Sequence, residues 1–265
     1  MQSTGQGQDI RLGSRYECKY LLNPMLVSEV REFIQPFMAP DRFAALRENY
    51  RYPISSLYLD SPDLLLYQQT VGGEKNRFKL RVRTYSDDSS TPVFFEVKRK
   101  INNIVQKRRA RVAREDALHF LAERLDGFGF HAVPAPASEL DHFASHMELA
   151  GARPLVRVRY KREAYESRGG DPVRVTLDTE LMHCVTFKTD LSHNHGRWVS
   201  TPVDGTILEI KFTERFPSWI RDLVQVFGLR QQPVPKYVWS VDHMMMEGRE
   251  SALSVAGFTL PVRRA

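Results

Sequence analysis

The sequence predicts an α+β protein with an antiparallel sheet of about eight to nine strands, closed into a barrel and surrounded by helices. The first observation is strict alternation, as at 77–83, where cations and apolar residues take turns without a break. The second is that short polar turns at 86–91 and 101–103 join successive strands, and connections this short cannot join parallel neighbours. The third is that both faces of the strands need cover, which closure into a barrel provides.

The expected strands are segments in which apolar and polar residues alternate between turn residues. In chain order they cover 14–22, 54–60, 77–85, 92–100, 104–113, 154–166, 172–179, 182–188 and 206–212. The polar segment 193–202 is expected to form a loop between the last two strands.

Helices are expected where proline, asparagine or glycine marks a start or an end. Asn23 and Pro24 begin the first helix, and Gly228 ends the fifth. In chain order the helices cover 24–37, a short stretch from the 61–63 turn to residue 71, 115–125, 138–149, 217–227 and 237–247.

The composition is that of a globular protein with a real core, since 42% of residues are apolar and 26% are charged. We expect a single domain over 14–247, between a disordered segment 1–13 and a loose tail 248–265. Segment 1–13 lacks the apolar core of a signal peptide, and no run of about 18 apolar residues could span a membrane. Cys18 and Cys184 are too few for a disulfide framework or a cysteine-based zinc site. The chain is therefore expected to be cytoplasmic, without membrane insertion.

One face of most expected strands carries mainly lysine and arginine. In chain order, the charged residues that share a face are Arg77, Lys79, Arg81 and Arg83; Glu96, Lys98 and Lys100; Lys107, Arg109 and Arg111; Arg157, Arg159 and Lys161; Arg174 and Asp178; and Glu209 and Lys211. Two like charges about 4 Å apart repel by about 4 kcal/mol at an effective dielectric constant near 20, so these rows indicate a bound polyanion or nucleotide phosphate. The net charge of +6 and isoelectric point near 9.3 favour the same acidic partners.

A solvated face is the ordinary explanation for one such strand. It explains the whole set less well, because the opposite faces are apolar, as at Phe78, Leu80 and Val82. A barrel with a basic interior and helices outside satisfies both faces.

Short strings in chain order over residues 14–245 resemble one protein family. RYECKY at 15–20 resembles the ExExK opening of the triphosphate tunnel (CYTH-like) superfamily, with Arg15 in place of the first glutamate. The remaining strings are similar to the VTC domain of vacuolar-transporter-chaperone polyphosphate polymerases: SLYLD at 56–60, LRVR at 80–83, EVK at 96–98, the basic stretch 107–111, YKREAY at 160–165, VRVTLDT at 173–179, LEIK at 208–211 and VPKY at 234–237.

The resemblance implies an antiparallel β-tunnel that holds a triphosphate along its axis, with Mn²⁺ or Mg²⁺ as cofactor. By this similarity the catalytic cations that grip phosphate are Lys19, Arg81, Arg83, Lys98, Arg162, Arg174 and Lys236. Further phosphate contacts are expected from Lys79, Lys107, Arg109 and Lys211, with either Lys107 or Arg109 lining the tunnel. The metal ligand is expected to be Glu209, helped by Glu17 or Glu96. Arg157 and Arg159 have the parity opposite to Arg162, and the resemblance favours Arg162.

The activity that the resemblance implies is transfer of the ATP γ-phosphate to a growing inorganic polyphosphate chain, with a membrane protein as the partner for export. Hydrolysis of a triphosphate is the alternative within the fold, and Arg15 in place of a glutamate argues against it. A module that only binds polyphosphate or RNA is the alternative outside enzymes. Phe78 and Phe95 point away from the cations and only Phe94 shares their side, so no stacking platform and no sequence-specific nucleic acid are expected.

No metal role is expected for four of the histidines or for the methionines at 244–246. For Asp178 a metal role is left open. His193 and His195 lie in a polar loop without a third ligand, and His142 and His146 lack the HExxH glutamate. The methionines at 244–246 are expected to pack a helix against the barrel. Asp178 is expected either to orient Arg174 or to bind metal.

Overall fold

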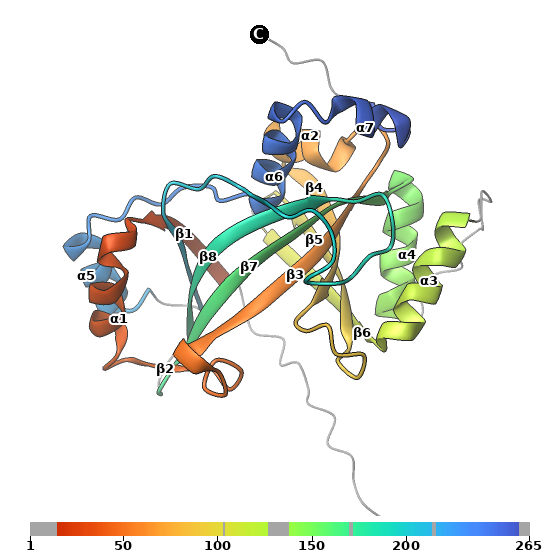
Figure 1. The fold of residues 1–265 in the computed structure, drawn as a ribbon. Helices are drawn as coiled ribbons and strands as arrows, with labels where there is room; N and C mark the ends of the chain where they lie inside the picture. The colour runs from red at the N-terminus through yellow and green to blue at the C-terminus, as the bar shows by residue number, and fades with distance from the viewer. Residues whose placement is uncertain (1–14, 103, 127–137, 170–171, 214–215, 260–265) are drawn as a thin grey trace, which may run out of the picture. The chain divides into compact units, whose positions relative to one another are not determined.

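The computed structural model describes residues 15–102, 104–126, 138–169, 172–213 and 216–259 (Figure 1). The expected disordered segment 1–13 lies outside these residues. Contacts divide the chain into two compact units, which we number as follows: unit 1 is 1–50, 163–177 and 205–234, and unit 2 is 51–162, 178–204 and 235–265. The single domain expected for 14–247 is thus divided between two units that share strands β7 (Arg153–Ser167) and β8 (Val173–Val185).

Unit 1 is a small sheet with helices on one face. The strands follow the order β1, β10, β8 and β7, with β2 paired to β7. Its elements are β1 (Arg15–Leu22), η1 (Pro24–Leu26), α1 (Val27–Ile34), β2 (Met38–Pro40), η2 (Glu48–Tyr50), β10 (Thr206–Thr213) and α5 (Ser218–Val226), besides its parts of β7 and β8. Val30 and Ile34 of α1 and Ile220 of α5 pack on Leu208 and Ile210 of β10 and form its core.

The first predicted helix is shorter than expected. Asn23 begins it as predicted, since its side chain accepts a hydrogen bond from the Met25 amide at 3.0 Å. The helix ends at Ile34, because the buried Met38 already belongs to β2, where it pairs with Ser167 of β7. A strand of three residues is too short for alternation to reveal.

Unit 2 is an antiparallel sheet in the order β8, β7, β3, β4, β5 and β6, with β9 paired to β8. Its further elements are β3 (Arg51–Asp60), α2 (Leu65–Val71), β4 (Asn76–Thr84), β5 (Val93–Ile101), β6 (Ile104–Val112), α3 (Arg114–Asp126), α4 (Glu139–Ala150), β9 (Val199–Ser200), α6 (Lys236–Met246) and α7 (Glu250–Val255). The predicted meander β4–β5–β6 is confirmed, with antiparallel pairing throughout.

Helices cover the apolar face of this meander, as expected. Figure 1 shows α3 and α4 side by side against it. The Phe95 ring meets Phe120 of α3 at 5.2 Å and Phe143 of α4 at 4.9 Å between centroids, both edge to face. Leu80 and Val82 of β4 are fully buried in the same cluster. The other face of these strands is therefore the one that carries the charged rows.

Three expectations need correction or stay open. The strands predicted at 172–179 and 182–188 are one strand, β8, in which Glu180 has a left-handed backbone with φ of 53°. The tail from Gly248 is not loose as far as residue 259, since α7 forms there and Leu253 and Phe258 are buried. Within the described residues, the strand pairings form an open path that ends at β1 and β6, so closure into a barrel stays a prediction.

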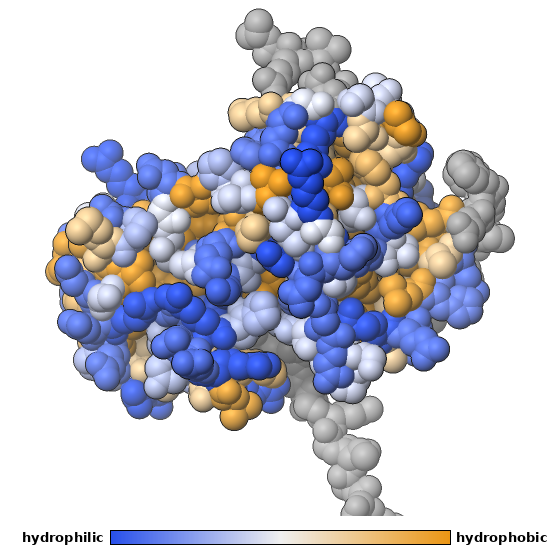
Figure 2. All heavy atoms as spheres, viewed as in Figure 1, coloured by the Kyte–Doolittle hydropathy of each residue, from blue (hydrophilic) through white to orange (hydrophobic). Residues whose placement is uncertain are grey.

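The molecular surface is largely polar on the face drawn in Figure 2, where hydrophobic side chains form patches among hydrophilic ones. Of the helices in the described residues, none has the length and apolar character needed to cross a membrane.

Candidate functional site

The charged rows of unit 2 are aligned across four neighbouring strands. Tyr58 on β3 lies opposite Arg81 on β4, which lies opposite Glu96 on β5, which lies opposite Arg109 on β6. Side chains two residues away share the face, which gives two flanking rows: Ser56, Arg83, Phe94 and Arg111, and Lys79, Lys98 and Lys107. We call this side of β3–β6 the basic face.

Glu96 is the counter-ion at the centre of the basic face. Its side chain is fully buried, and its carboxylate lies 2.6 Å from Arg81 Nη2, 2.8 Å from Lys107 Nζ and 3.1 Å from Arg109 Nε. Arg83 Nε approaches to 4.0 Å. Burial alone would raise the pKa of Glu96, but these cations hold it well below its usual range. A divalent ion here would meet four positive charges, so Glu96 does not fit the metal role expected for it.

Arg83 is a buried cation held mainly by neutral groups. Its Nε donates to Ser56 Oγ at 3.2 Å and its Nη2 donates to Tyr160 Oη at 3.4 Å. These hydroxyls orient the guanidinium group without cancelling its charge. Arg81 differs, because it donates to Glu96 at 2.7 Å as well as to a hydroxyl. Arg83 is therefore the cation of the basic face best placed to bind an incoming anion.

Lys107 and Arg109 both reach Glu96, and which of them lines a tunnel stays a prediction. Desolvation of its ammonium group, with the charges of Arg81 and Arg83, outweighs the attraction of Glu96 and lowers the pKa of Lys107 to about 7. An anion that neutralised these neighbours would raise that pKa again.

Aromatic rings also line the basic face: Phe94 shares the side of the cations, as expected, and Tyr58 and Tyr85 add to it. The Arg109 guanidinium lies 3.6 Å from the centroid of the Phe94 ring, and it donates to Tyr85 Oη at 3.0 Å. Burial would raise the pKa of Tyr58, but Arg81 and Arg83 prevail and lower it to about 8. Tyr58 and Tyr85 were not expected on this face, because Tyr58 lies on a strand without a cationic row and Tyr85 follows the last residue of β4.

A second charged group of unit 2 is centred on Asp178 of β8. Its carboxylate accepts from Arg162 Nε at 2.6 Å and Nη2 at 2.8 Å, and it pairs with Lys236 Nζ at 2.8 Å. Both cations lie over the Tyr160 ring, at 5.3 and 4.9 Å from its centroid. Since Tyr160 also accepts from Arg83, its side chain connects this group with the basic face. Asp178 thus orients Arg162 and Lys236.

Arg157 and Arg159 serve a different purpose on the opposite face of β7. Arg157 is 2% exposed; it pairs with Asp190 at 2.9 Å and donates to the carbonyl of His195 at 2.7 Å. Arg159 donates to the carbonyl of His193 at 2.6 Å. These arginines anchor the loop after β8, so simple alternation was misleading here, and Arg162 is the residue that joins the other expected cations.

The two histidines of this loop have other partners than a metal. His193 is buried with its Nε2 2.8 Å from Thr84 Oγ1, and His195 Nδ1 lies 2.8 Å from an oxygen of Asp190. These contacts connect the loop to Thr84 and to Asp190.

Unit 1 carries a balanced group of charges on β1 and β10. Lys19 lies opposite Glu209, and Glu17 lies opposite Lys211. Lys19 Nζ is 2.6 Å from Glu17 Oε1 and 3.8 Å from Glu209 Oε2, and Lys211 also pairs with Glu209. The two carboxylates converge on one ammonium group, which is how oxygen ligands converge on a divalent ion.

Arg174 belongs to unit 1 and has carboxylate partners there. It pairs with Asp41 at 2.6 Å and with Glu166. Asp41 is 2% exposed and also accepts from the backbone amides of Phe43 and Ala44. A phosphate bound by Arg174 would have to compete with these two carboxylates.

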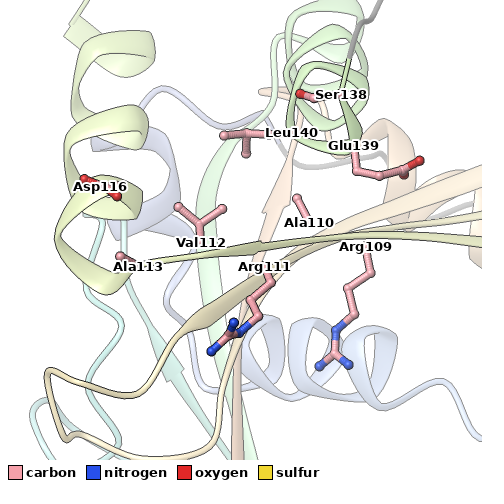
Figure 3. A pocket seen from close by; sticks show the side chains of 9 residues that line it. All are labelled: Arg109, Ala110, Arg111, Val112, Ala113, Asp116, Ser138, Glu139 and Leu140. Carbon is pink, nitrogen blue, oxygen red and sulfur yellow. The ribbon is translucent and has the colours of Figure 1, made fainter. Parts of the chain in front are cut away.

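A surface pocket of about 560 Å³ lies beside β6, between the first turns of α3 and α4 (Figure 3). In Figure 3, Arg109 and Arg111 point to the side of β6 opposite to Ala110 and Leu140. The pocket is lined by Ala110, Val112 and Leu140 on the apolar side of β6, and also by Arg109 and Arg111, which belong to the rows of the basic face.

Comparisons with known proteins place the chain in a family. A curated relative, vacuolar transporter chaperone complex subunit 4 of Trypanosoma cruzi, is 25% identical over 220 residues, covering 70% of this chain. The chain spans 27% of the length of that relative. Solved structures similar to this chain include a proposed adenylate cyclase of Vibrio parahaemolyticus, with a TM-score of 0.44 and 13% identity. This match covers 86% of this chain and 98% of the other. The chain is also similar to a solved structure of a Pyrococcus horikoshii protein, with a TM-score of 0.43 and 12% identity. This match covers 89% of this chain and 99% of the other.

The family model of the VTC domain matches residues 14–245, the same span over which the sequence strings resemble that domain. This match covers most of the chain, including the strands that carry the basic face. The chain belongs to the VTC domain family.

Proposed function

We propose that the chain is a polyphosphate polymerase, which binds ATP and inorganic polyphosphate through the basic face and transfers the ATP γ-phosphate to the growing chain. The observation that carries the proposal is Arg83, a 7% exposed guanidinium group held by the hydroxyls of Ser56 and Tyr160. Glu96 approaches Arg83 Nε only to 4.0 Å, so much of the charge of the guanidinium group remains to attract an anion. Membership of the VTC domain family supports phosphate as that anion.

Phosphoryl transfer needs positioned charges more than covalent help from the protein. Arg81 and Arg83 offer guanidinium forks that suit phosphate oxygens, and Lys107 offers a point charge. Arg162 and Lys236, aligned by Asp178, offer two more cations in the same unit. Lys79 and Lys98 share the row of Lys107 and extend it for further phosphates of a chain.

A divalent ion fits Glu17 and Glu209 of unit 1, because both carboxylates already approach one cation. Oxygen donors are the ligands that Mg²⁺ and Mn²⁺ prefer. When bound there, such an ion would neutralise charge on phosphate oxygens that reach unit 1. Lys19 would have to turn away from the carboxylates, and it would then be available for phosphate, as would Lys211.

The product of the reaction tests the proposal. The purified chain is incubated with ATP and Mn²⁺, and polyphosphate is separated from phosphate by gel electrophoresis. We expect polymer together with ADP. Free phosphate without polymer would instead identify a triphosphatase, and bound phosphate without either product would identify a binding module.

Paired arginine variants test the assignment of Arg83. Arg83→Met keeps the bulk of the side chain and should lower the rate about 100-fold or more, since a charge that contacts the transferred group is lost. Arg108→Met is the control: Arg108 is on β6, 47% exposed, and pairs with Glu139 on the opposite side of the strand from Arg109. Equal rates in both variants, with unchanged circular dichroism, would rule out the basic face as the site.

Three expectations remain predictions. They are enclosure of the polyphosphate chain in a tunnel, a cytoplasmic location, and a membrane protein as the partner for export. The relative from Trypanosoma cruzi is a subunit of a complex, which supports a search for partners by affinity purification.

A further inference from the structure

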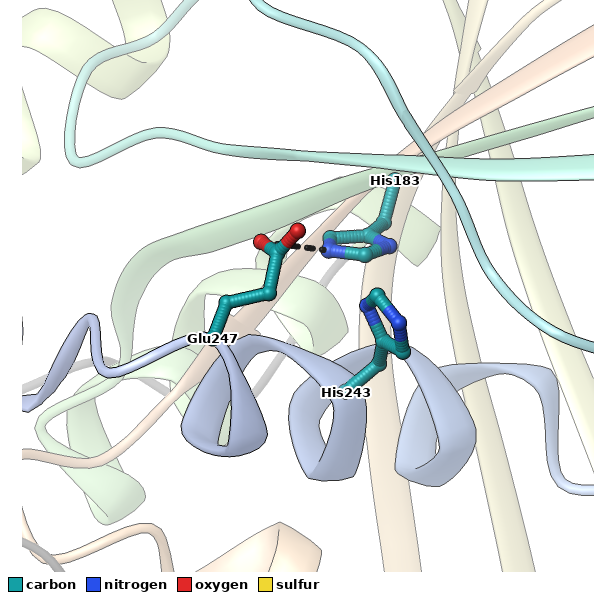
Figure 4. A group of neighbouring side chains, drawn as sticks. All are labelled: His183, His243 and Glu247. Carbon is teal, nitrogen blue, oxygen red and sulfur yellow. Dashed lines mark ion pairs between the residues drawn. The ribbon is translucent and has the colours of Figure 1, made fainter.

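A cluster of two histidines and a glutamate in unit 2 was not expected from the sequence. His183 of β8, His243 of α6 and Glu247 just after α6 point toward one another (Figure 4). One potential ligand atom of each lies within 4.8 Å of the other two, and His183 Nε2 is 4.0 Å from Glu247 Oε2. The rings of the histidines are 5.3 Å apart between centroids.

One nitrogen of each histidine in this cluster has no hydrogen-bond partner within the described residues. His183 is fully buried, and its Nδ1 lies 2.8 Å from Thr201 Oγ1. Its Nε2 and the Nδ1 of His243 are buried and, within the described residues, have no hydrogen-bond partner. Such atoms are uncommon in folded proteins and call for an explanation. An ion between them would provide one for both.

The backbone of unit 2 brings these side chains together in two ways. His243 and Glu247 are four residues apart, so they share one face of the helix turn. On β8, Glu180 with φ of 53° interrupts alternation, so that both Asp178 and His183 face α6, although their numbers differ in parity. This interruption is the reason that alternation alone could not find the cluster.

We propose that His183, His243 and Glu247 form a binding site for a transition-metal ion of the Zn²⁺ class. Two imidazole nitrogens and one carboxylate are a ligand set that Zn²⁺ accepts, with a fourth position left for water, whereas Mg²⁺ prefers oxygen alone. Ligand atoms about 2.1 Å from a common ion are closer together than 4.8 Å, so the side chains must move inward. Glu247 can do so, since it is 28% exposed.

The remaining contacts of the cluster suit this role. The contact with Thr201 holds the His183 ring so that Nε2 faces the ion, as outer partners commonly do for histidine ligands. Arg249 Nε lies 3.0 Å from Glu247 Oε2, the oxygen that also approaches His183, so the carboxylate must turn to offer an oxygen to the metal. The ion would join β8 to the end of α6, the helix whose first residue, Lys236, pairs with Asp178.

Metal binding is measured directly on the full chain after treatment with a chelator. With excess Mg²⁺ present to occupy oxygen-only sites, we expect one Zn²⁺ per chain by calorimetry. Substitution by Co²⁺ should give the visible absorption of a tetrahedral site with nitrogen ligands, and the melting temperature should rise. No uptake of Zn²⁺ under these conditions would overturn the proposal.

Variants locate the ion. Glu247→Gln and His243→Gln affect residues that are not fully buried, and each should weaken Zn²⁺ binding at least about tenfold while circular dichroism is unchanged. His195→Gln and His146→Gln are controls, because both histidines are outside the cluster, and they should bind as the unmodified chain does. A loss confined to the control variants would assign the ion to the surface and refute the site. ATP is absent throughout, so the outcome is independent of the polymerase assay.

Discussion

Hydroxyl groups determine how the arginines of the basic face are used. Tyr160 and Ser56 hold Arg83 with its charge available, whereas Glu96 takes up much of the charge of Arg81. Glu96 also reduces the repulsion among the surrounding cations. As a single carboxylate it balances only part of their charge. The residues of this face are therefore arranged for an anion that arrives from outside.

The pH dependence of anion binding is expected to follow Lys107. Its pKa of about 7 lies below the usual 10.5, so above pH 7 most of the Lys107 side chains are neutral. An anion that binds the charged form of Lys107 must then be accompanied by uptake of a proton at Lys107, which weakens binding as the pH rises. The dissociation constant of tripolyphosphate should rise by up to about tenfold per pH unit between pH 7 and 9. Calorimetry at several pH values measures this slope.

The same titration of variants identifies the group. Lys107→Arg stays charged and should flatten the slope. Tyr58, with a pKa of about 8, could add to the slope by becoming negative, so Tyr58→Phe is measured beside it. A slope unchanged in both variants would contradict the assignment.

Asp178→Asn is expected to destabilise the fold because it leaves Arg162 and Lys236 facing each other at a buried position. Loss of one partner of a buried ion pair costs about 3–5 kcal/mol in the free energy of unfolding, which urea titration can detect. The exposed pair Lys161 and Glu180 is the control, and Glu180→Gln should cost less than about 1 kcal/mol. Tripolyphosphate should raise the melting temperature of Asp178→Asn more than that of the unmodified chain; a smaller rise would argue against phosphate at these cations.

At the scale of the element, the interruption of β8 decides which side chains face α6. Glu180 adopts a backbone conformation that costs a residue with a Cβ atom about 1 kcal/mol, and its side chain is exposed. The strand retains this conformation because Asp178 and His183 both have contacts with α6.

Glu180→Gly should therefore keep or raise the free energy of unfolding, and Glu180→Val should lower it by more than about 1 kcal/mol, because a β-branched residue tolerates positive φ poorly. Urea titration measures both. If valine were as stable as glycine at this position, the interruption would not be a constraint of the strand.

At the scale of the whole molecule, the two units differ in charge balance. In unit 1 the lysines of β1 and β10 pair with Glu17 and Glu209, and Arg174 pairs with two further carboxylates. In unit 2, two carboxylates, Glu96 and Asp178, lie among a larger set of cations. In the part of the chain that the structure describes, these cations are Arg81, Arg83, Lys107, Arg109, Arg162 and Lys236. A polyanion should therefore bind first to unit 2.

Hydrogen exchange can detect this difference. Tripolyphosphate alone should slow exchange in β4, β5, β6 and the start of α6. Protection of β1 and β10 should require Mn²⁺ as well, and Glu209→Gln should abolish that second effect alone. Equal protection of both units without metal would contradict the division of roles.

Most elements of the fold were predictable because their signals are local. Alternation located β4, β5 and β6 within one or two residues, and proline and asparagine located the start of the first helix. The elements that were missed depend on distant partners: β2 exists through its pairing with β7, and α7 through burial of Leu253. The prediction of two strands in place of β8 was wrong because the alternation changes parity at Glu180. In the sequence, such a change looks like a turn between two strands.

The sequence by itself determined the antiparallel meander, the cations that share a face on it and the family to which the chain belongs, since these depend on alternation and on the order of short strings. Tertiary structure decided how those cations are used. It placed Glu96 among the arginines as a counter-ion, gave Arg157 to a loop and Arg162 to Asp178, and brought His183 to His243 and Glu247. The reason is that strand parity specifies only the face of a side chain, whereas its partners depend on register, twist and interruptions of the neighbouring elements.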